Sequence, residues 1–194
     1  MTHATSATCL AAILAMASPM AAGPKTSGPK TYKNAEFGIR LQVPGDDLLC
    51  QSPKDEHDHG FGLVLGGGSP ADCHEGVRHR SIWLFAFSNV LDDTKHLPGL
   101  LKMGCDAAGG RCEPTPVVLQ IPGLPSATGR VDLPDGWIVV VLATKAGVPD
   151  RFDPSEPSVN YLFSLWTTKE YLDQDLGAFR TVLQSVRLSG APSQ

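Results

Sequence analysis

Short stretches in which apolar and polar residues alternate with a period of two recur along this chain of 194 residues. Residues 37–43 alternate in this way and are followed by a Pro-Gly pair, as expected for a half-buried strand that ends in a turn. Six further stretches are predicted to be strands, namely residues 61–65, 82–87, 117–121, 127–133, 137–144 and 159–166. Turn residues separate several of them, and residues 134–136 fit a tight hairpin. The pattern therefore predicts an antiparallel sheet of about six or seven strands.

Two stretches are predicted to be helical, and in the longer one apolar residues recur at spacings of three and four. The shorter one is residues 97–103, which has Pro98 near its first turn and is short enough to be a turn instead. The longer one, residues 169–186, closes the domain, and Thr167 followed by Glu170 has the spacing of a capping box at its start. The polar face of this helix is expected to carry Asp173, Gln174, Asp175, Arg180 and Gln184. A C-terminal helix packed on an antiparallel sheet makes the predicted fold class α+β.

The first 22 residues contain no Lys, Arg, Asp or Glu. Residues 9–17 form an apolar run of the length expected for the hydrophobic region of a secretory signal, and small residues suited to cleavage follow it. We expect residues 1–22 to be a signal peptide, and the mature protein to be periplasmic or secreted. No later apolar run approaches the roughly 18 residues needed for a membrane span.

Cleavage of such a signal removes Cys9 and leaves four cysteines, Cys50, Cys73, Cys105 and Cys112. An even number of cysteines in an exported domain is typical of disulfide bonds. The short separation of Cys105 and Cys112 favours a bond between them, which leaves Cys50 to pair with Cys73. A zinc site is the alternative, but none of these spacings provides the CxxC-like pairs that it needs.

The composition, with 42% hydrophobic and 19% charged residues, is that of an ordinary globular protein of one domain. Residues 23–31 are expected to be a flexible linker, residues 32–188 a single globular domain and residues 189–194 a disordered tail. The 16 basic residues are scattered along the sequence against 20 acidic ones, which gives a net charge of -4. Nucleic acid and anionic membrane are therefore not expected as partners.

The globular part opens with the sequence YKNAEFGI at residues 32–39 and reaches Pro44 soon afterwards. This opening resembles the "Y-x-N-x-E-(Y/F)-G-(F/I)…P" start of the Mog1/PsbP-like superfamily, and the sequence FRTVLQSV at residues 179–186 resembles the final helix and exit of those domains. The Trp that many of these domains carry after the Pro is absent here. The resemblance implies an antiparallel sheet flanked by helices, in a superfamily that serves mainly as small binding and assembly modules.

Two polar stretches carry four of the histidines. The first holds Asp55, Glu56, His57, Asp58 and His59, and the second holds His74 and His79. Imidazoles with carboxylates nearby can ligate zinc or copper, so one hypothesis is a metal site that uses these four histidines. The two stretches flank the predicted strand at residues 61–65, however, and its ends lie roughly 15 Å apart at about 3.3 Å per residue. The alternatives are two solvated loops or a surface that binds a partner.

A second interaction surface is predicted between the last two strands. Residues 146–158 form a connection of 13 residues that is rich in Pro and net acidic. Loops of this length without a function are uncommon. Phe152 is an apolar group among charged neighbours, so the expected binding residues of this loop are Asp150, Arg151, Phe152 and Asp153.

Local motifs of catalysis are not found in the sequence. His74 and His79 are five residues apart, one more than the H-E-x-x-H motif requires, and the glycines at residues 66–68 lack the lysine of a phosphate-binding loop. We therefore expect a small exported binding protein without a cofactor, an inhibitor or immunity-type protein that blocks a secreted toxin or a cell-wall-degrading hydrolase. A periplasmic metal-binding protein and an uncharacterised hydrolase are the alternatives.

Overall fold

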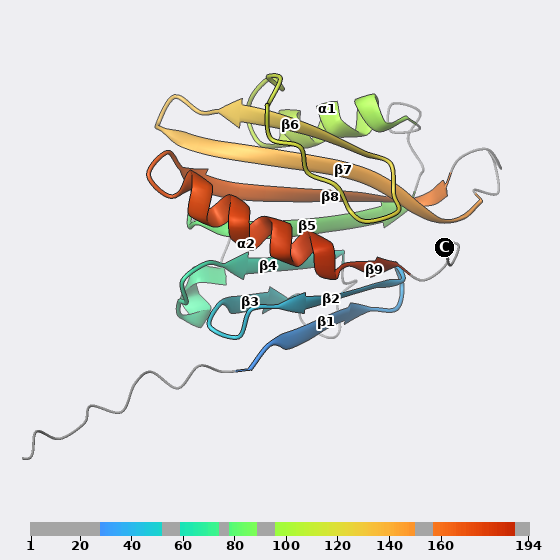
Figure 1. The fold of residues 1–194 in the computed structure, drawn as a ribbon, viewed down its shortest axis with the longest axis horizontal. Coiled ribbons are helices and arrows are strands. Elements are labelled where there is room, and N and C mark those ends of the chain that lie inside the picture. The colour runs from blue at the N-terminus through green and yellow to red at the C-terminus, as the bar shows by residue number, and fades with distance from the viewer. Residues whose placement is uncertain (1–27, 52–58, 74–77, 89–95, 150–156, 189–194) are drawn as a thin grey trace, which may run out of the picture.

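The computed structural model describes residues 28–51, 59–73, 78–88, 96–149 and 157–188 (Figure 1). The predicted signal peptide, most of the linker and the tail lie outside these residues. The elements, in chain order, are β1 (Lys30–Asn34), β2 (Ile39–Val43), β3 (Leu48–Gln51), β4 (Gly60–Val64), the 3-10 helix η1 (Pro70–Cys73), β5 (Ser81–Ser88), α1 (Leu97–Ala107), β6 (Ser126–Asp132), β7 (Trp137–Pro149), β8 (Pro157–Thr168), α2 (Leu172–Ser185) and β9 (Arg187–Leu188).

The described strands form two antiparallel sheets. Six strands make the larger sheet, in the order β3-β4-β5-β8-β7-β6, and three make the smaller one, in the order β1-β2-β9. The helix α2 packs on β8 and also on β2. The predicted α+β class and the antiparallel sheet with a C-terminal helix packed on it are confirmed, with the strands divided between two sheets.

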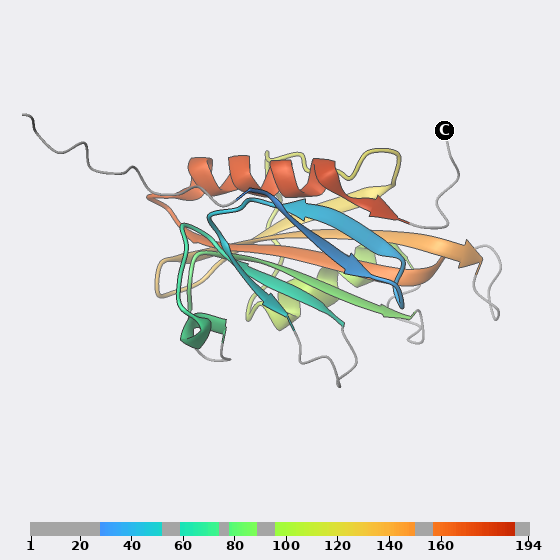
Figure 2. The same ribbon diagram turned by 90° about the horizontal axis from the view of Figure 1, so that it is seen from below.

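Both faces of the larger sheet carry other elements (Figures 1 and 2). On one face, α2 and the smaller sheet enclose a core that includes Phe163 and Phe179. On the other face, α1 packs on β6, β7 and β8 around Leu100 and Val141. Because side chains alternate between the faces of a strand, the middle of β7 is buried on both sides and is a nearly continuous apolar run.

Several strands lie where the alternating pattern predicts them, but the strand predictions also need correction. β1, β3 and β9 were not expected, and β1 begins at Lys30, inside the segment predicted to be a linker. Residues 117–121 are not a strand. Leu119 and Ile121 are buried against the core, and Thr128 Oγ1 donates a hydrogen bond to the carbonyl of Leu119 at 3.2 Å. The alternation in this segment therefore reflects packing of an extended chain and not pairing in a sheet.

The start of α2 also differs from the prediction. The helix begins at Leu172, its N-cap is Tyr171, and no side chain caps it, so the predicted capping box is wrong. Thr167 Oγ1 instead donates to the carboxylate of Asp175. Asp175 was expected on the polar face but is only 1% exposed. A polar position in the sequence is buried here because Arg80, which directly precedes β5, reaches the same carboxylate.

Two disulfide bonds link the cysteines in the pairing that their spacing favours. Cys50 in β3 is bonded to Cys73 at the end of η1, with their Cα atoms 5.4 Å apart. Cys105 in α1 is bonded to Cys112, with their Cα atoms 5.5 Å apart. Disulfides are typical of proteins in oxidising compartments outside the cytosol. Among the described residues, neither helix is long and apolar enough to cross a membrane.

Candidate functional site

The most unusual surface of the described residues is a pair of aromatic side chains on β5. The strand has the sequence SIWLFAFS, in which every second residue from Ile82 faces the core beneath α2. The residues between them face the other side of the sheet, where α1 lies. There Trp83 is 38% exposed and Phe85 is 49% exposed. Large aromatic side chains gathered on a surface mark a site of interaction more often than a single exposed apolar residue does.

These aromatic side chains form one side of a groove whose other side is α1. The helix packs on β6, β7 and β8 and therefore leaves the next strand, β5, open. The groove has a volume of about 340 Å³. Its lining consists of Trp83, Phe85, Met103, Gly104, Ala107, Ala108, Val141, Leu162, Ser164 and Trp166. We call this feature the aromatic groove.

Small residues of α1 bring the helix close to the sheet. A Cβ atom at Gly104 would lie 2.8 Å from Cγ1 of Val141 and 3.1 Å from Cδ2 of Leu162, so a larger residue would push the helix away. The Cys105–Cys112 disulfide joins the last turns of α1 to the chain that follows, next to Gly129 of β6, where a Cβ atom would lie 2.7 Å from Cys112 Sγ. The wall of the groove is thereby held in a fixed position.

Two contacts fix the orientation of the Trp83 ring, one with its face and one with its indole N–H. A Cβ atom at Gly62 of β4 would lie 2.6 Å from the indole ring, so the ring rests directly on the backbone of that strand. The indole Nε1 donates to Ser81 Oγ at 2.9 Å, and this hydroxyl donates to the carbonyl of His79 at 2.9 Å. Trp83 is therefore a preorganised surface and would lose little side-chain entropy on binding.

A row of rings continues from the aromatic groove toward the opposite end of β5. The ring of Phe85 lies 5.4 Å from that of Phe87 and 5.8 Å from that of His59, and the His59 ring lies 5.6 Å from that of Phe37. His59 Nδ1 also lies 3.3 Å from the carbonyl oxygen of Ala86. Of the residues that the sequence singled out for binding, His59 is the one that the described structure places beside this groove.

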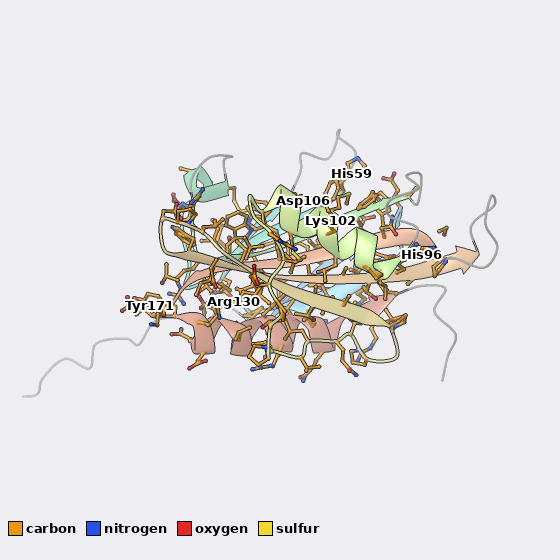
Figure 3. The ribbon with its side chains drawn as sticks, turned by 90° about the horizontal axis from the view of Figure 1, so that it is seen from above. His59, His96, Lys102, Asp106, Arg130 and Tyr171 are labelled. Atoms are coloured by element: carbon orange, nitrogen blue, oxygen red, sulfur yellow. A yellow bond between two sulfur atoms is a disulfide. The ribbon has the colours of Figure 1, made fainter. Side chains whose placement is uncertain are left out.

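The lining of the aromatic groove limits its chemistry. None of the ten lining side chains is ionisable, and Ser164 and the indole N–H groups are its polar members. The described lining can therefore bind an apolar or aromatic group, and it contains no acid, base or charged nucleophile. Two charged residues of α1, Lys102 and Asp106, are not among these lining residues and form an ion pair with each other (Figure 3).

The histidines proposed for a metal site are only partly described. His57 and His74 lie outside the described residues, as do Asp55, Glu56 and Asp58. His59 directly precedes β4, whereas His79 precedes β5, whose first residue pairs with the last residue of β4. The two described histidines therefore lie at opposite ends of this strand pair. Within the described ranges there is no group of three or more His, Cys, Asp or Glu residues that could hold a metal ion.

His79 belongs instead to a small polar contact around the turn formed by Ser69 and η1. Its Nε2 lies 3.3 Å from Asp72 Oδ1. The backbone N–H of Ser69 donates to Asp72 Oδ2 at 2.6 Å, and this hydrogen bond, helped by the Ser69 hydroxyl and the neighbouring His79, lowers the pKa of the Asp72 carboxyl. These contacts shape the turn.

The connection between β7 and β8 is shorter than predicted. The strands pair through Ala146 with Val159 and extend, past an irregularity, to Pro149 opposite Pro157. The predicted loop of residues 146–158 is therefore wrong at both ends, because backbone pairing continues into it. Asp150, Arg151, Phe152 and Asp153 lie outside the described residues.

A buried polar cluster joins α2 to β8 and to Arg80, the residue before β5. Asp175 accepts hydrogen bonds from Arg80 and from Thr167, and the guanidinium of Arg80 stacks 3.8 Å from the centre of the Tyr171 ring. The hydrogen bond to Asp175 raises the pKa of Arg80 above its usual value. Because these side chains satisfy one another beneath the start of α2, we assign the cluster to the stability of the fold.

Comparison with known proteins gives similarity in fold. No protein family model and no curated protein sequence matches the chain. The solution structure of the cyanobacterial PsbP protein (CyanoP) from Synechocystis is 15% identical, with a TM-score of 0.42, and covers 87% of this chain and 96% of its own. The crystal structure of the Saccharomyces cerevisiae Ran-binding protein Mog1p is 11% identical, with a TM-score of 0.40, and covers 84% of this chain and 96% of its own. The structural similarity to a PsbP protein and to Mog1p thus spans most of the chain, and it concerns the fold alone.

Proposed function

We propose that this protein is exported and binds a protein partner through the aromatic groove, as an inhibitor or immunity-type protein that blocks a secreted or cell-wall-degrading enzyme. The observation that carries the proposal is the exposure of Trp83 and Phe85 beside a groove with an apolar lining. Aromatic side chains that fill or form pockets contribute much of the binding energy in protein interfaces.

The exposed rings give an order of magnitude for the energy available. A Trp or Phe side chain buries about 150–250 Å² when it is fully covered, so covering the exposed parts of Trp83 and Phe85 removes roughly 200 Å² from water. At about 25 cal/mol per Å² this is worth up to about 5 kcal/mol before the costs of association are subtracted. Contacts of this size can anchor a complex.

The size of the groove favours a side chain of a protein over a small molecule. Its volume of about 340 Å³ is close to the lower end of the range for small-molecule sites, which is about 300–1,000 Å³. Such sites use a small number of polar groups to orient the ligand, and Ser164 is the one hydroxyl among the described lining residues. One or two apolar side chains of a partner fit this volume, and Met103 adds a flexible wall that adapts to their shape.

The other features support an exported binding protein. Two disulfides in a chain of this size fit an oxidising compartment. None of the described residues that line the groove is ionisable, which supports binding at this site in preference to catalysis. An inhibitor that acts outside the cytoplasm needs a stable fold and a preorganised surface, and the fixed orientation of Trp83 supplies such a surface.

The experiment uses immobilised purified protein and the secreted and envelope fractions of the source cells. We expect the native protein to retain a hydrolase that mass spectrometry identifies. The Trp83→Ser and Phe85→Ser variants should lose it, because each removes part of the apolar contact. Val118→Ser is the matched control, since Val118 is 80% exposed on a segment that packs on the opposite side of the larger sheet.

Activity then tests the inhibitory role. Titration of the retained enzyme with native protein should abolish its activity at a ratio of one to one, and the Phe85→Ser variant should require a large excess. A hydrolase that is retained but stays fully active would refute the inhibitor role. Retention that is unchanged by both groove variants would refute the aromatic groove as the binding site.

A further inference from the structure

Three cationic side chains lie side by side on the outer face of the smaller sheet. The strand register places Lys33 of β1 directly opposite Arg40 of β2, and Arg40 directly opposite Arg187 of β9. All three residues are exposed, whereas the neighbours Tyr32 and Ile39 face the core. We call Lys33, Arg40 and Arg187 the cationic row.

The cationic row is not neutralised within the described part of the chain. Neither Lys33 nor Arg40 forms an ion pair or a side-chain hydrogen bond with a described residue. Like charges directly opposite each other on neighbouring strands destabilise a sheet. The chain as a whole has a net charge of -4, so a cluster of three cations runs against the overall balance of charge. An arrangement that costs stability and gathers one sign of charge points to an anionic partner.

Hydrogen bonds at the end of α2 hold Arg187 and the backbone of β2 in place. Arg187 Nη1 donates to the carbonyls of Gln184 at 3.0 Å and Val186 at 2.7 Å, at the end of α2. Ser185 Oγ accepts a hydrogen bond from the backbone N–H of Gln42 at 3.0 Å, which ties β2 to the same end of the helix. A pocket of about 370 Å³ adjoins the three cations. The described residues that line it are Lys33, Asn34, Ala35, Gly38, Ile39, Arg40, Arg187 and Leu188, and none of these is acidic.

We propose that the cationic row is a docking site for an acidic helix of a protein partner. Neighbouring strands lie about 4.8 Å apart, so three charges in register span about 10 Å. Carboxylates at positions i, i+3 and i+7 of a helix lie on one face and span about 10.5 Å at 1.5 Å per residue. In an extended strand, three side chains on one face span about 13 Å, which fits the cationic row less well. The helix therefore crosses the strands with one carboxylate above each cation.

This inference does not rest on the aromatic groove. The cationic row lies on the smaller sheet, and the groove lies on the α1 side of the larger sheet (Figures 1 and 2). Variants at Trp83 and Phe85 leave the cationic row intact, so failure of one proposal is distinguishable from failure of the other.

The test is an NMR titration, which measures weak binding, with two synthetic helical peptides of identical composition. The first carries Glu at i, i+3 and i+7, and the second carries Glu at i, i+2 and i+5, which spreads the charges around the helix. We expect the first peptide to bind more tightly, with shifts at the amides of β1, β2 and β9. Lys33→Gln and Arg40→Gln should each weaken it by up to about fivefold, the upper range of an exposed ion pair, and the double variant by up to about 25-fold. High salt should weaken binding of the native protein.

Lys169→Gln is the control, because it removes one exposed cation at the opposite end of α2. This variant should bind the first peptide as the native protein does. Equal affinity for the two peptides, or equal losses in Lys169→Gln and Arg40→Gln, would overturn the proposal. Binding to vesicles of anionic phospholipid that depends on Lys33 and Arg40, with no binding of the first peptide, would also overturn it and assign the cationic row to a lipid surface.

Discussion

Replacement of Asp175 by Asn is expected to be among the most damaging single conservative changes in this fold. The carboxylate is buried where β5, β8 and α2 meet. Its Oδ2 accepts from Arg80 Nε at 2.9 Å, and its two oxygens also accept from Arg80 Nη2 and Thr167 Oγ1. Asn removes the negative charge and replaces one acceptor oxygen by an NH₂ group, which is a donor that would face another donor.

The structure gives the magnitude. Removal of one partner from a buried ion pair costs about 3–5 kcal/mol, because the other charge is left buried without compensation. The Arg80 side chain keeps 23% of its surface exposed and stacks on the Tyr171 ring, so its charge stays partly hydrated. We therefore expect a loss near the lower end, about 3 kcal/mol, out of a total stability of about 5–15 kcal/mol for a domain of ordinary size.

Urea unfolding followed by Trp fluorescence measures this loss as a lower midpoint with an unchanged slope. The double variant Arg80→Met and Asp175→Leu should recover most of the stability, because an apolar pair in place of a buried ion pair is often close to neutral. A loss below about 1 kcal/mol for Asp175→Asn, or a double variant less stable than either single one, would refute the assignment of this cluster to a buried ion pair.

Two further predictions concern Asp47, in the turn between β2 and β3, and the disulfide at the end of α1. Burial raises the pKa of the Asp47 carboxyl above its usual value of 3.8, and the hydrogen bond from the Gly66 N–H opposes this only in part. The folded protein therefore favours the protonated carboxyl. The stability that this shift contributes is fully present below pH 3.8 and is lost as the pH rises through the raised pKa. Asp47→Asn should therefore be more stable than the native protein at neutral pH in urea unfolding, and the difference should vanish below pH 3.8; a variant that is less stable at neutral pH would contradict this. Replacement of Cys105 and Cys112 by Ala should lower the free energy of unfolding by about 2.5 kcal/mol, which is the loop-entropy value for so short a loop. It should also weaken binding at the aromatic groove. An unchanged thermal midpoint would argue against a structural role of this disulfide.

The aromatic groove shows how far the sequence leads toward the site. The apolar run at residues 82–87 predicts β5 correctly, and a run that is apolar at successive positions indicates a strand covered on both faces. In the structure one face is covered, but Trp83 and Phe85 on the other face lie beyond the edge of α1. The sequence contains the residues of the groove, yet the position of α1 decides that they stay exposed.

The cationic row illustrates the same limit for charge. Arg187 is far in the sequence from Lys33 and Arg40, which lie seven residues apart, and the basic residues are scattered along the chain. The antiparallel pairing of β1 with β2 and of β2 with β9 places them next to one another. Asp175 is the reverse case, since a residue that helical periodicity assigns to the solvent side is buried by a partner from a distant strand.

The sequence by itself determined the local features of this protein: the strands with alternating or continuous apolar residues, the C-terminal helix and the pairing of the four cysteines. These follow from periodicity and short separations, which depend on neighbours in the chain. The tertiary structure alone decided the division of the strands into two sheets, the burial of Asp175, the exposure of Trp83 and Phe85 and the alignment of the three cations. Each of these depends on contacts between residues distant in sequence, and no local pattern specifies which surfaces those contacts cover.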